Sequence, residues 1–300
     1  MEILKNKIDF AVIVSVRNAN PNGDPLNGNR PRINYDGLGE LSDVCIKRKI
    51  RNRLLEAGHF IFVQSDDNRV DDYKSLRSRA EGELKDIDMK DEKKYREEAC
   101  KKWIDVRAFG QVFAYKGGAK KGKKDAESGE EQGDDKGVSI GIRGPVSIHS
   151  AFSVSPVSVS SIQITKSVSG EGDGTKRASD TMGMKHRVDH GVYVFYGSMN
   201  PQLASKTSFS DDDAEAIKQA LKTLFQNDAS SARPEGSMEV YKVYWWKHNC
   251  NNGQYSSAKV HRSLEVSLKS GVTDPKDIEK DYDIKLQSLA DLKPEIIDGL

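Results

Sequence analysis

The sequence predicts an α+β fold in which an antiparallel sheet carries helices on one face. An alternating apolar segment opens the chain, a helical stretch follows a turn-rich loop, and β-branched segments surround a further helix in the second half. This order of strand, helix, strand, insertion, strands, helix and strand is typical of that fold class. The 300 residues suffice for one large domain or two small ones, and no internal repeat is visible.

The first strand is predicted over residues 8–17 because apolar residues alternate there. One face comprises Ile8, Phe10, Val12, Val14 and Val16. Ala11 and Ile13 add apolar weight to the other face, so we expect a well-buried strand. A stretch with two Asn-Gly pairs and three prolines then predicts turns over residues 18–32.

A helix is predicted after this loop, with Ser42 as N-cap and Asp43 in the first turn. Gly58 is suited to ending it. Its expected apolar face comprises Val44, Ile50, Leu54 and the end at Leu55–Ala57. A short second strand is predicted at His59–Gln64.

Charge-rich helices are predicted over residues 71–103, anchored by Leu76, Leu84, Ile87 and Trp103. Residues 116–137 contain no apolar side chain larger than alanine. Such a segment cannot repay the entropy of ordering, so we expect a mobile loop.

The second half of the chain begins with β-branched residues that alternate with serines over residues 138–168, which predicts two or three strands. Residues 169–187 predict a long flexible excursion. Ser210 and the acids after it predict a helix that runs to about Asn227. Further strands are predicted at residues 190–199, 238–246 and 259–268.

The composition fits a soluble chain with long polar insertions. Hydrophobic residues make up 36%, charged residues 31%, and the mean hydropathy is -0.67. No apolar run approaches the ~20 residues that span a bilayer, and MEILKNKIDF lacks the features of a signal peptide. Cys45, Cys100 and Cys250 lie far apart and form no CxxC pair, so the sequence indicates neither a disulfide framework nor a zinc ribbon. We expect a cytoplasmic protein.

Charge is segregated along the chain although 47 basic and 46 acidic residues give a net charge of +1. For a nucleic-acid partner this distribution matters more than the sum. The densest basic run holds five cations without an acid: Lys47, Arg48, Lys49, Arg51 and Arg53. On a helix these cations repel one another unless an anion neutralises them, and the helix N-terminus can itself point amides at phosphates. A solvated basic face is the alternative.

A second candidate surface lies at residues 165–187, where hydroxyls and cations flank methionines. Thr165, Lys166 and Ser167 stand at one root. The other root holds Met182, Met184, Lys185, His186 and Arg187. Such a hairpin suits gripping a nucleic-acid backbone and wedging an apolar side chain between bases. An ordinary loop whose methionines pack into the core is the alternative.

Signals for an enzyme are poor. The segment GGAKKGKK at 117–124 lacks the Ser or Thr and the following helix of a P-loop. His186 and His190 form a close pair, but on a predicted strand rather than a helix, which disfavours a metal site. Asp24 and Asp36 are candidates for binding a metal or activating a 2′-hydroxyl, although Asp beside Gly or Pro is usually turn chemistry.

Aromatic residues gather on two of the predicted strands: Tyr193, Phe195, Tyr196, Tyr241, Tyr244, Trp245 and Trp246. If exposed, they would form a stacking platform for bases. The aromatic core of a sheet is the more ordinary interpretation.

Residues 20–54, together with the preceding strand IDFAVIVSV, resemble the opening of the CRISPR Cascade backbone subunit of type I-C, the Csd-two branch of the Cas-seven family. The block reads NPNGDPLNGNRPRINYDGLGELSDVCIKRKIRNRL. Further segments match in the expected order: DVRAFGQVF (105–113), RGPVSIHSAFSVSPVSV (143–159), ITKS (164–167) and MGMKHRVDHGVYVFYG (182–197).

The resemblance implies one modified RRM-like (ferredoxin-like) palm domain over residues 1–300. Its insertions would be a helical finger region plus the mobile loop at 66–137 and a thumb-like hairpin at 165–187. It implies a non-catalytic subunit, without cofactor or metal, that polymerises head to tail along the crRNA spacer. Implied partners are crRNA, target DNA through guide pairing, further copies of the chain, and Cas-five and Cas-eight type subunits, with or without a small subunit; no membrane is implied.

The resemblance also assigns candidate RNA-binding residues. Guide phosphates are expected at the junction of loop and helix, at Ser42, Lys47, Arg48 and Arg51. Asn20 and Arg32 are expected to shape the loop above them, and Arg143 is a further candidate. The thumb candidates are Thr165, Lys166, Ser167, Met184, Lys185 and His186.

Two other functions stay open. Backbone subunits of type III effector complexes resemble this architecture and cut target RNA with a loop aspartate, a place that Asp24 or Asp36 would take here. The chain would then be a metal-dependent endoribonuclease. A cytoplasmic filament or scaffold protein whose basic helix binds an acidic partner is the third possibility.

Overall fold

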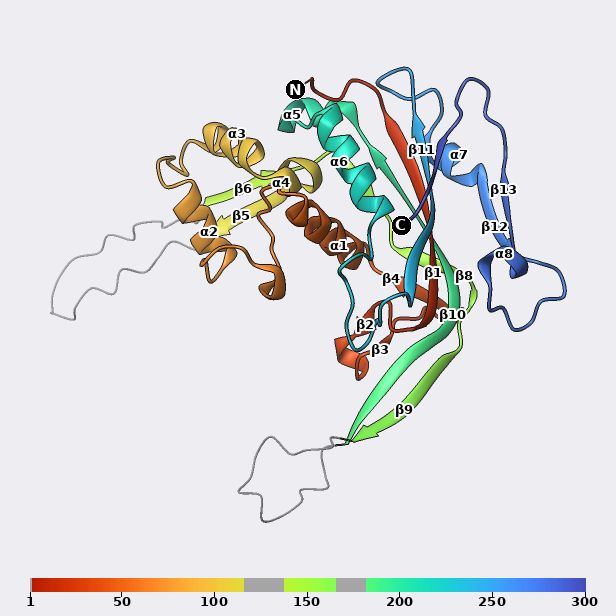
Figure 1. Ribbon diagram of the computed structural model, residues 1–300. Coiled ribbons are helices and arrows are strands. Elements are labelled where there is room, and N and C mark those ends of the chain that lie inside the picture. The colour runs from red at the N-terminus through yellow and green to blue at the C-terminus, as the bar shows by residue number, and fades with distance from the viewer. Residues whose placement is uncertain (1, 116–137, 166–181) are drawn as a thin grey trace, which may run out of the picture.

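An eight-stranded sheet forms the centre of the computed structural model, which describes residues 2–115, 138–165 and 182–300 (Figure 1). Its strands are β1 (Ile8–Ala19), β4 (Leu38–Leu41), β7 (Val146–Ile148), β8 (Ala151–Pro156), β9 (Val159–Thr165), β10 (Met182–Met199), β11 (Met238–Lys247) and β14 (Glu295–Asp298). The hydrogen-bonded order is β14–β11–β1–β10–β8–β4, with β7 and β9 paired to β10. All pairings are antiparallel, which confirms the predicted fold class.

β1 is buried on both faces because it lies between β10 and β11. Phe10 stands opposite Gly197 on one side and Trp245 on the other. A Cβ at Gly197 would lie 2.2 Å from the Phe10 ring, so glycine leaves room for that ring. Phe10 belongs to the larger core, whereas Ala11 and Ile13 belong to a second core across the sheet. The predicted alternation is confirmed.

Three helices cover one face of the sheet: α1 (Asp43–Glu56), α5 (Pro201–Thr207) and α6 (Asp211–Lys222). Ile46, Ile50 and Leu54 of α1 pack into the larger core. Val44 is 69% exposed, so its predicted place on the apolar face is wrong and Ile46, one turn before Ile50, takes it. Gly58 has φ +86°, the left-handed backbone that ends the helix as predicted.

The other face of the sheet is covered by a C-terminal unit: α7 (Ser257–Arg262), β12 (Leu264–Leu268), α8 (Ile278–Asp281) and β13 (Tyr282–Leu286). Val260 and Leu264 pack there with Trp246 and Tyr244. The strand predicted over residues 259–268 is therefore wrong in its first half, which is helical. The aromatic residues of the two predicted strands are mostly part of the core: Trp246 is 1% exposed and Tyr193 is fully buried.

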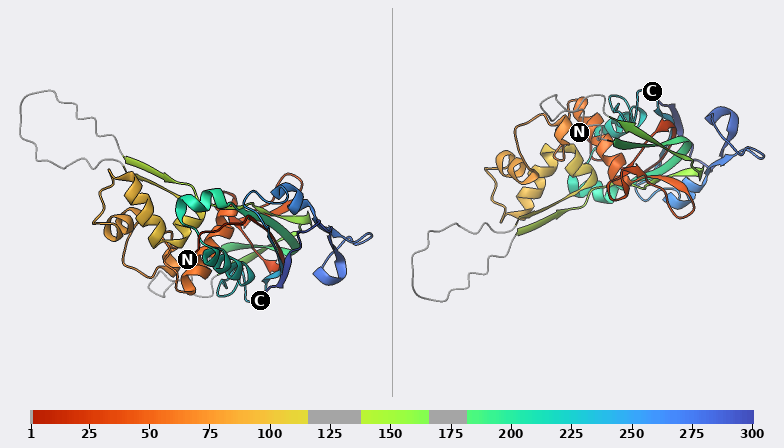
Figure 2. Two further views of the ribbon diagram at one scale, coloured as in Figure 1. Left: turned by 90° about the horizontal axis from the view of Figure 1, so that it is seen from above. Right: turned by 90° about the horizontal axis from the view of Figure 1, so that it is seen from below.

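A separate unit beside the sheet contains α2 (Leu76–Glu83), α3 (Glu92–Lys102), α4 (Ile104–Phe109), β5 (Gln111–Tyr115) and β6 (Val138–Ile142) (Figure 2). It has its own core, in which the Phe62 ring lies 4.7 Å from Trp103 and 5.1 Å from Phe113. Helices are confirmed within the predicted range 71–103, at α2 and α3, but Leu76 is 38% exposed, so its predicted role as an anchor is wrong. The strand predicted at His59–Gln64 is wrong, because that segment is irregular.

A bidentate ion pair joins this unit to the helices on the sheet. Arg107 of α4 donates to Asp213 of α6, with Nε–Oδ2 at 2.9 Å and Nη2–Oδ1 at 2.6 Å. Asp213 also accepts from the N–H of Ser210, the N-cap of α6. That helix ends at Lys222 rather than near Asn227, where the chain turns.

Beyond the sheet, β9 and β10 continue as a two-stranded hairpin that projects away from the body of the protein (Figure 1). The pairing of β10 with β1 ends at Val188, and residues 182–187 pair with β9. This part of the predicted excursion is thus strand, and residues 138–165 hold four strands rather than two or three. The predicted loop at 116–137, Lys166, Ser167 and the rest of the excursion lie outside the described residues.

The turn-rich loop contains a small hairpin of β2 (Gly23–Asp24) and β3 (Arg30–Pro31), joined by a short 3-10 helix (Pro25–Asn27). A second short 3-10 helix spans Asp66–Asn68. Within the described ranges, no helix is long and apolar enough to cross a membrane.

Candidate nucleic-acid interface

The N-terminus of α1 is tied to the turn-rich loop by side-chain hydrogen bonds. Ser42 Oγ accepts from the Cys45 N–H at 3.3 Å, and Asn22 Oδ1 accepts from the N–H and Oγ of Ser42 at 2.9 Å each. Ser150 Oγ accepts from the Asp43 N–H at 3.3 Å. The expectation that these amides point freely at phosphates is therefore wrong at Asp43 and Cys45, because the protein's own hydroxyls occupy them.

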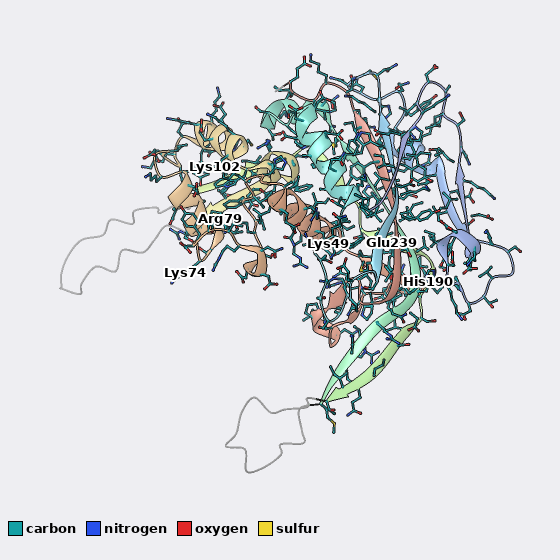
Figure 3. All side chains as sticks on the ribbon, in the orientation of Figure 1. Lys49, Lys74, Arg79, Lys102, His190 and Glu239 are labelled. Carbon is teal, nitrogen blue, oxygen red and sulfur yellow. The ribbon has the colours of Figure 1, made fainter. Side chains whose placement is uncertain are left out.

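Lys49, in the middle of the basic run on α1 (Figure 3), is buried at 1% exposure. Its ammonium pairs with Asp228, which also accepts from Arg233 Nε at 3.0 Å. The Phe225 ring lies 5.3 Å from Lys49 Nζ. Burial lowers the pKa of Lys49, and the Asp228 carboxylate opposes that shift. Lys49 therefore belongs to the packing beneath α1 and is not accessible to a ligand.

Arg51 also points into the protein. Its Nε donates to Asp105 at 2.9 Å, and its guanidinium lies 5.1 Å from the Phe109 ring. Asp105 is 1% exposed and accepts from the backbone N–H groups of Phe62 at 2.7 Å and Val63 at 3.0 Å. The anions that neutralise Lys49 and Arg51 are therefore distant acids of the same chain.

Arg48 is the member of the basic run that stays open. It is exposed and forms no ion pair with the described residues. Lys47 pairs with Asp43 at 3.0 Å on the partly exposed flank of the helix. Arg53 pairs with Glu56 and donates to Thr223 Oγ1 at 3.1 Å. Fewer cations of this run are therefore available to a ligand than the sequence indicates.

Asn20 and Arg32 hold the small hairpin in shape. Asn20 is 3% exposed, and its Nδ2 donates to the Asn29 carbonyl at 2.7 Å. Arg32 lies 3.4 Å from Asp24, whose Oδ1 accepts from the Leu26 N–H at 3.2 Å. Asp24 thus acts in a turn, as its neighbours Gly and Pro predict.

The projecting hairpin has two chemically different faces because cross-strand partners share a face. Thr165 stands opposite Met182, and Gln163 opposite Met184, on one face. Lys185 stands opposite Ile162 on the other face. Met184 and Lys185 therefore cannot contact one ligand surface side by side.

His186 belongs to the root of the hairpin rather than to its surface. It is 7% exposed, and its Nδ1 lies 2.8 Å from Ser161 Oγ on the facing strand. A residue buried in this way positions the hairpin.

Arg143 is exposed in the connection from β6 to β7, where Gly110 and Gly144 let two backbone segments pass closely.

The acids proposed for metal chemistry are not gathered. Among the residues that the structure describes, no group of three or more His, Cys, Asp or Glu side chains is placed to hold a metal ion. Asp24 is engaged with Arg32 and a backbone amide. Asp36 is exposed.

Sequence reasoning missed two residues that organise this region. Asn22 fixes the start of α1 through Ser42, and Asp105 links α1 to the adjacent helical unit. Both lie in segments that carry the family resemblance, NPNGDP and DVRAFGQVF. That resemblance is the sequence feature that could have pointed to them.

The fold has counterparts among solved structures. The structure is similar to a chain of a solved "CRISPR RNA-guided surveillance complex, pre-nicking", with a TM-score of 0.50 and 14% identity, covering 89% of this chain and 84% of that one. A chain of another "CRISPR RNA-guided surveillance complex" gives a TM-score of 0.42 at 16% identity, with 80% and 68% covered.

The sequence then gives the family. The family "CRISPR-associated protein Cas7" matches residues 6–287, and the chain belongs to it. A curated relative, "CRISPR-associated protein Cas7" of Haloferax volcanii, is 25% identical over 229 residues. That match covers 75% of this chain and 66% of the relative, so it spans a little less than two thirds of the relative's length.

Proposed function

We propose that this chain is a non-catalytic crRNA-binding subunit that polymerises along the guide spacer as the backbone of a type I-C Cascade complex. Membership of the Cas7 family supports the general role. The type I-C assignment rests on the specific 20–54 block and its companion segments. The complex would act in the cytoplasm, with target DNA bound through guide pairing and with Cas-five and Cas-eight type subunits as neighbours.

The projecting hairpin is the observation that carries the proposal. Its exposed apolar side chains lie on both faces: Met182 at 62%, Met184 at 54%, Ile162 at 42% and Ile164 at 49%. A two-stranded hairpin with both faces in water is marginal on its own, and exposed apolar patches mark contact surfaces. We assign it as the thumb, with Met184 or Met182 as the wedge between bases.

Phosphate contacts are assigned to the surface between α1 and this thumb. Arg48 supplies the exposed cation of α1, and Lys185 supplies a partly exposed one on the hairpin. Arg143 stays a further candidate, whereas Arg51 and His186 act through packing. The main sheet would be the palm and the unit with its own core the finger. Such contacts read backbone and not sequence, which leaves recognition to base pairing.

The test is co-expression with a repeat–spacer RNA, followed by purification and measurement of particle mass. We expect one guide-length RNA in a particle far heavier than 33.3 kDa. Arg48→Ala should weaken RNA retention, whereas Arg53→Ala, which alters a cation paired with Glu56, is the matched control. A monomer without RNA under these conditions refutes the proposal.

A metal-dependent endoribonuclease is the second candidate, and the exposed carboxylate of Asp36 is what favours it. Magnesium-dependent cleavage of complementary RNA that Asp36→Ala abolishes and Asp24→Ala leaves intact would establish it. Absence of cleavage by the assembled complex removes it. A scaffold for an acidic protein would instead purify without RNA and lose its partner on Arg48→Ala.

A further inference from the structure

Tyr35 presents its entire ring to solvent. Its relative exposure is 110%, in the loop between β3 and β4. Tyrosine is more often partly buried, because its ring carries a large apolar surface. Tyr193, Tyr244 and Tyr282 follow that pattern at 0%, 4% and 3% exposure. Full exposure at Tyr35 therefore calls for a physical reason.

The loop that carries Tyr35 is held in one conformation by hydrogen bonds on both sides of it. Asn34 Oδ1 accepts from the N–H groups of Asp36 and Leu38, both at 2.9 Å. The Asn34 N–H donates to the Leu38 carbonyl at 2.9 Å, and the Gly37 N–H to the Asn34 carbonyl at 3.1 Å. Gly37 adopts φ +78°, which favours glycine. The ring is displayed by a fixed turn.

Backbone hydrogen bonds also place this turn beside the proposed RNA path. The Val157 N–H, two residues before β9, donates to the Gly37 carbonyl at 3.1 Å. On the other side the Arg32 N–H donates to the Asn22 carbonyl at 2.9 Å, and Asn22 caps the start of α1 through Ser42. The turn that carries Tyr35 is thus hydrogen-bonded on one side to the segment before β9 and linked on the other to the residues that cap α1.

We infer that Tyr35 stacks on an unpaired base of the bound RNA, an inference that rests on the proposed function. A flat aromatic face stacks on any base and is sequence-tolerant, as a guide-binding subunit requires. The fixed turn lowers the ordering cost of binding, since only two side-chain torsions remain to be restrained.

The surroundings favour a nucleic acid over a protein partner. Arg30, which precedes the turn, is exposed and would attract a phosphate backbone, whereas Arg32 is paired with Asp24. The neighbouring Asp36 carboxylate opposes a phosphate directly at the turn. An uncharged base face at Tyr35, with a phosphate nearer Arg30, satisfies both conditions.

The experiment compares two labelled single-stranded RNAs of equal length by fluorescence anisotropy: one with natural bases and one with abasic ribose phosphates throughout. Both carry the same charge, so their affinity difference reports base contact. We expect Tyr35→Ala to weaken binding of the natural RNA about fivefold or more and to leave the abasic RNA within about twofold, as expected where no base face is present. Tyr35→Phe should retain the wild-type preference. Phe60→Ala, at a 71% exposed ring lining a different groove, is the matched control.

The outcomes separate the two hypotheses. If the wild type binds neither RNA, the proposed function fails. If the wild type binds the natural RNA and Tyr35→Ala keeps the full preference over the abasic RNA, the stacking inference is overturned while the proposed function stands. If Tyr35→Ala leaves that preference intact and changes the oligomeric mass without RNA, Tyr35 belongs to a protein contact and the inference is likewise overturned.

Discussion

Replacement of Asp105 by alanine tests whether the basic helix is held by the chain's own acids. The carboxylate accepts from Arg51 Nε and from two backbone N–H groups, those of Phe62 and Val63. The side chains of Arg51 and Asp105 are 14% and 1% exposed. Asp105→Ala would leave the guanidinium and both amides without their acceptor.

The magnitude follows from what is left unpaired. An unsatisfied buried amide costs about 1–3 kcal/mol, and an uncompensated buried charge about 3–5 kcal/mol. The three losses share one acceptor and are not additive, so we expect a total near the larger figure, about 3–5 kcal/mol. Asp105→Asn keeps one acceptor oxygen and should lose about 2 kcal/mol.

Urea unfolding followed by tryptophan fluorescence measures the effect, because Trp103 packs on Phe62. Asp36→Ala, at an exposed acid, is the control and should stay within about 0.5 kcal/mol of the wild type. Adding Arg51→Met to Asp105→Ala should recover part of the loss by removing the orphan charge. A loss below about 1 kcal/mol for Asp105→Ala, the size of one ordinary hydrogen bond, would refute the reasoning.

Three further predictions concern charge, packing and pH. Arg48→Ala should lower the slope of log affinity against log salt for single-stranded RNA by about 0.7; an unchanged slope in an anisotropy series would mean that Arg48 meets no phosphate. A Cβ at Gly39 would lie 2.2 Å from the Tyr193 hydroxyl, so Gly39→Ala should lower the free energy of unfolding in urea by about 1–3 kcal/mol. Adding Tyr193→Phe should recover part of this loss, and no recovery would mean that the clash is not its cause. Burial lowers the pKa of His190 below its ordinary value of 6.5, so the unfolded chain binds more protons and stability falls on acidification below that value. His190→Gln should flatten the dependence of Tm on pH there, and superimposable curves would contradict this.

Local pattern was sufficient for the fold where neighbouring residues decide the outcome. The alternation in β1 and the cap at Ser42 are properties of adjacent residues, and both are confirmed. The segment at His59–Gln64 was misassigned for a non-local reason. Ile61 and Phe62 are buried, but the Asp105 carboxylate, rather than a neighbouring strand, accepts from the N–H groups of Phe62 and Val63.

The site was harder to predict because charge neutralisation is also non-local. Lys49 and Arg51 look unpaired within the basic run, yet their acids lie 179 and 54 residues away along the chain. Nothing in the run itself distinguishes Arg48 from Lys49 and Arg51. Its exposure follows only from its position on the helix. The same limit applies to Met184 and Lys185, whose opposite faces follow from the pairing of β10 with β9.

The continuity of β10 has a mechanical consequence. Its 18 residues run without interruption from the hairpin into the centre of the sheet. At about 3.3 Å per residue, the segment 182–187 acts as a cantilever of roughly 20 Å. Because β10 pairs with both β9 and β1, a force on the tip of the hairpin acts on β1 as well. Binding of the hairpin to a partner should therefore slow amide hydrogen exchange along β1 as well as along β9.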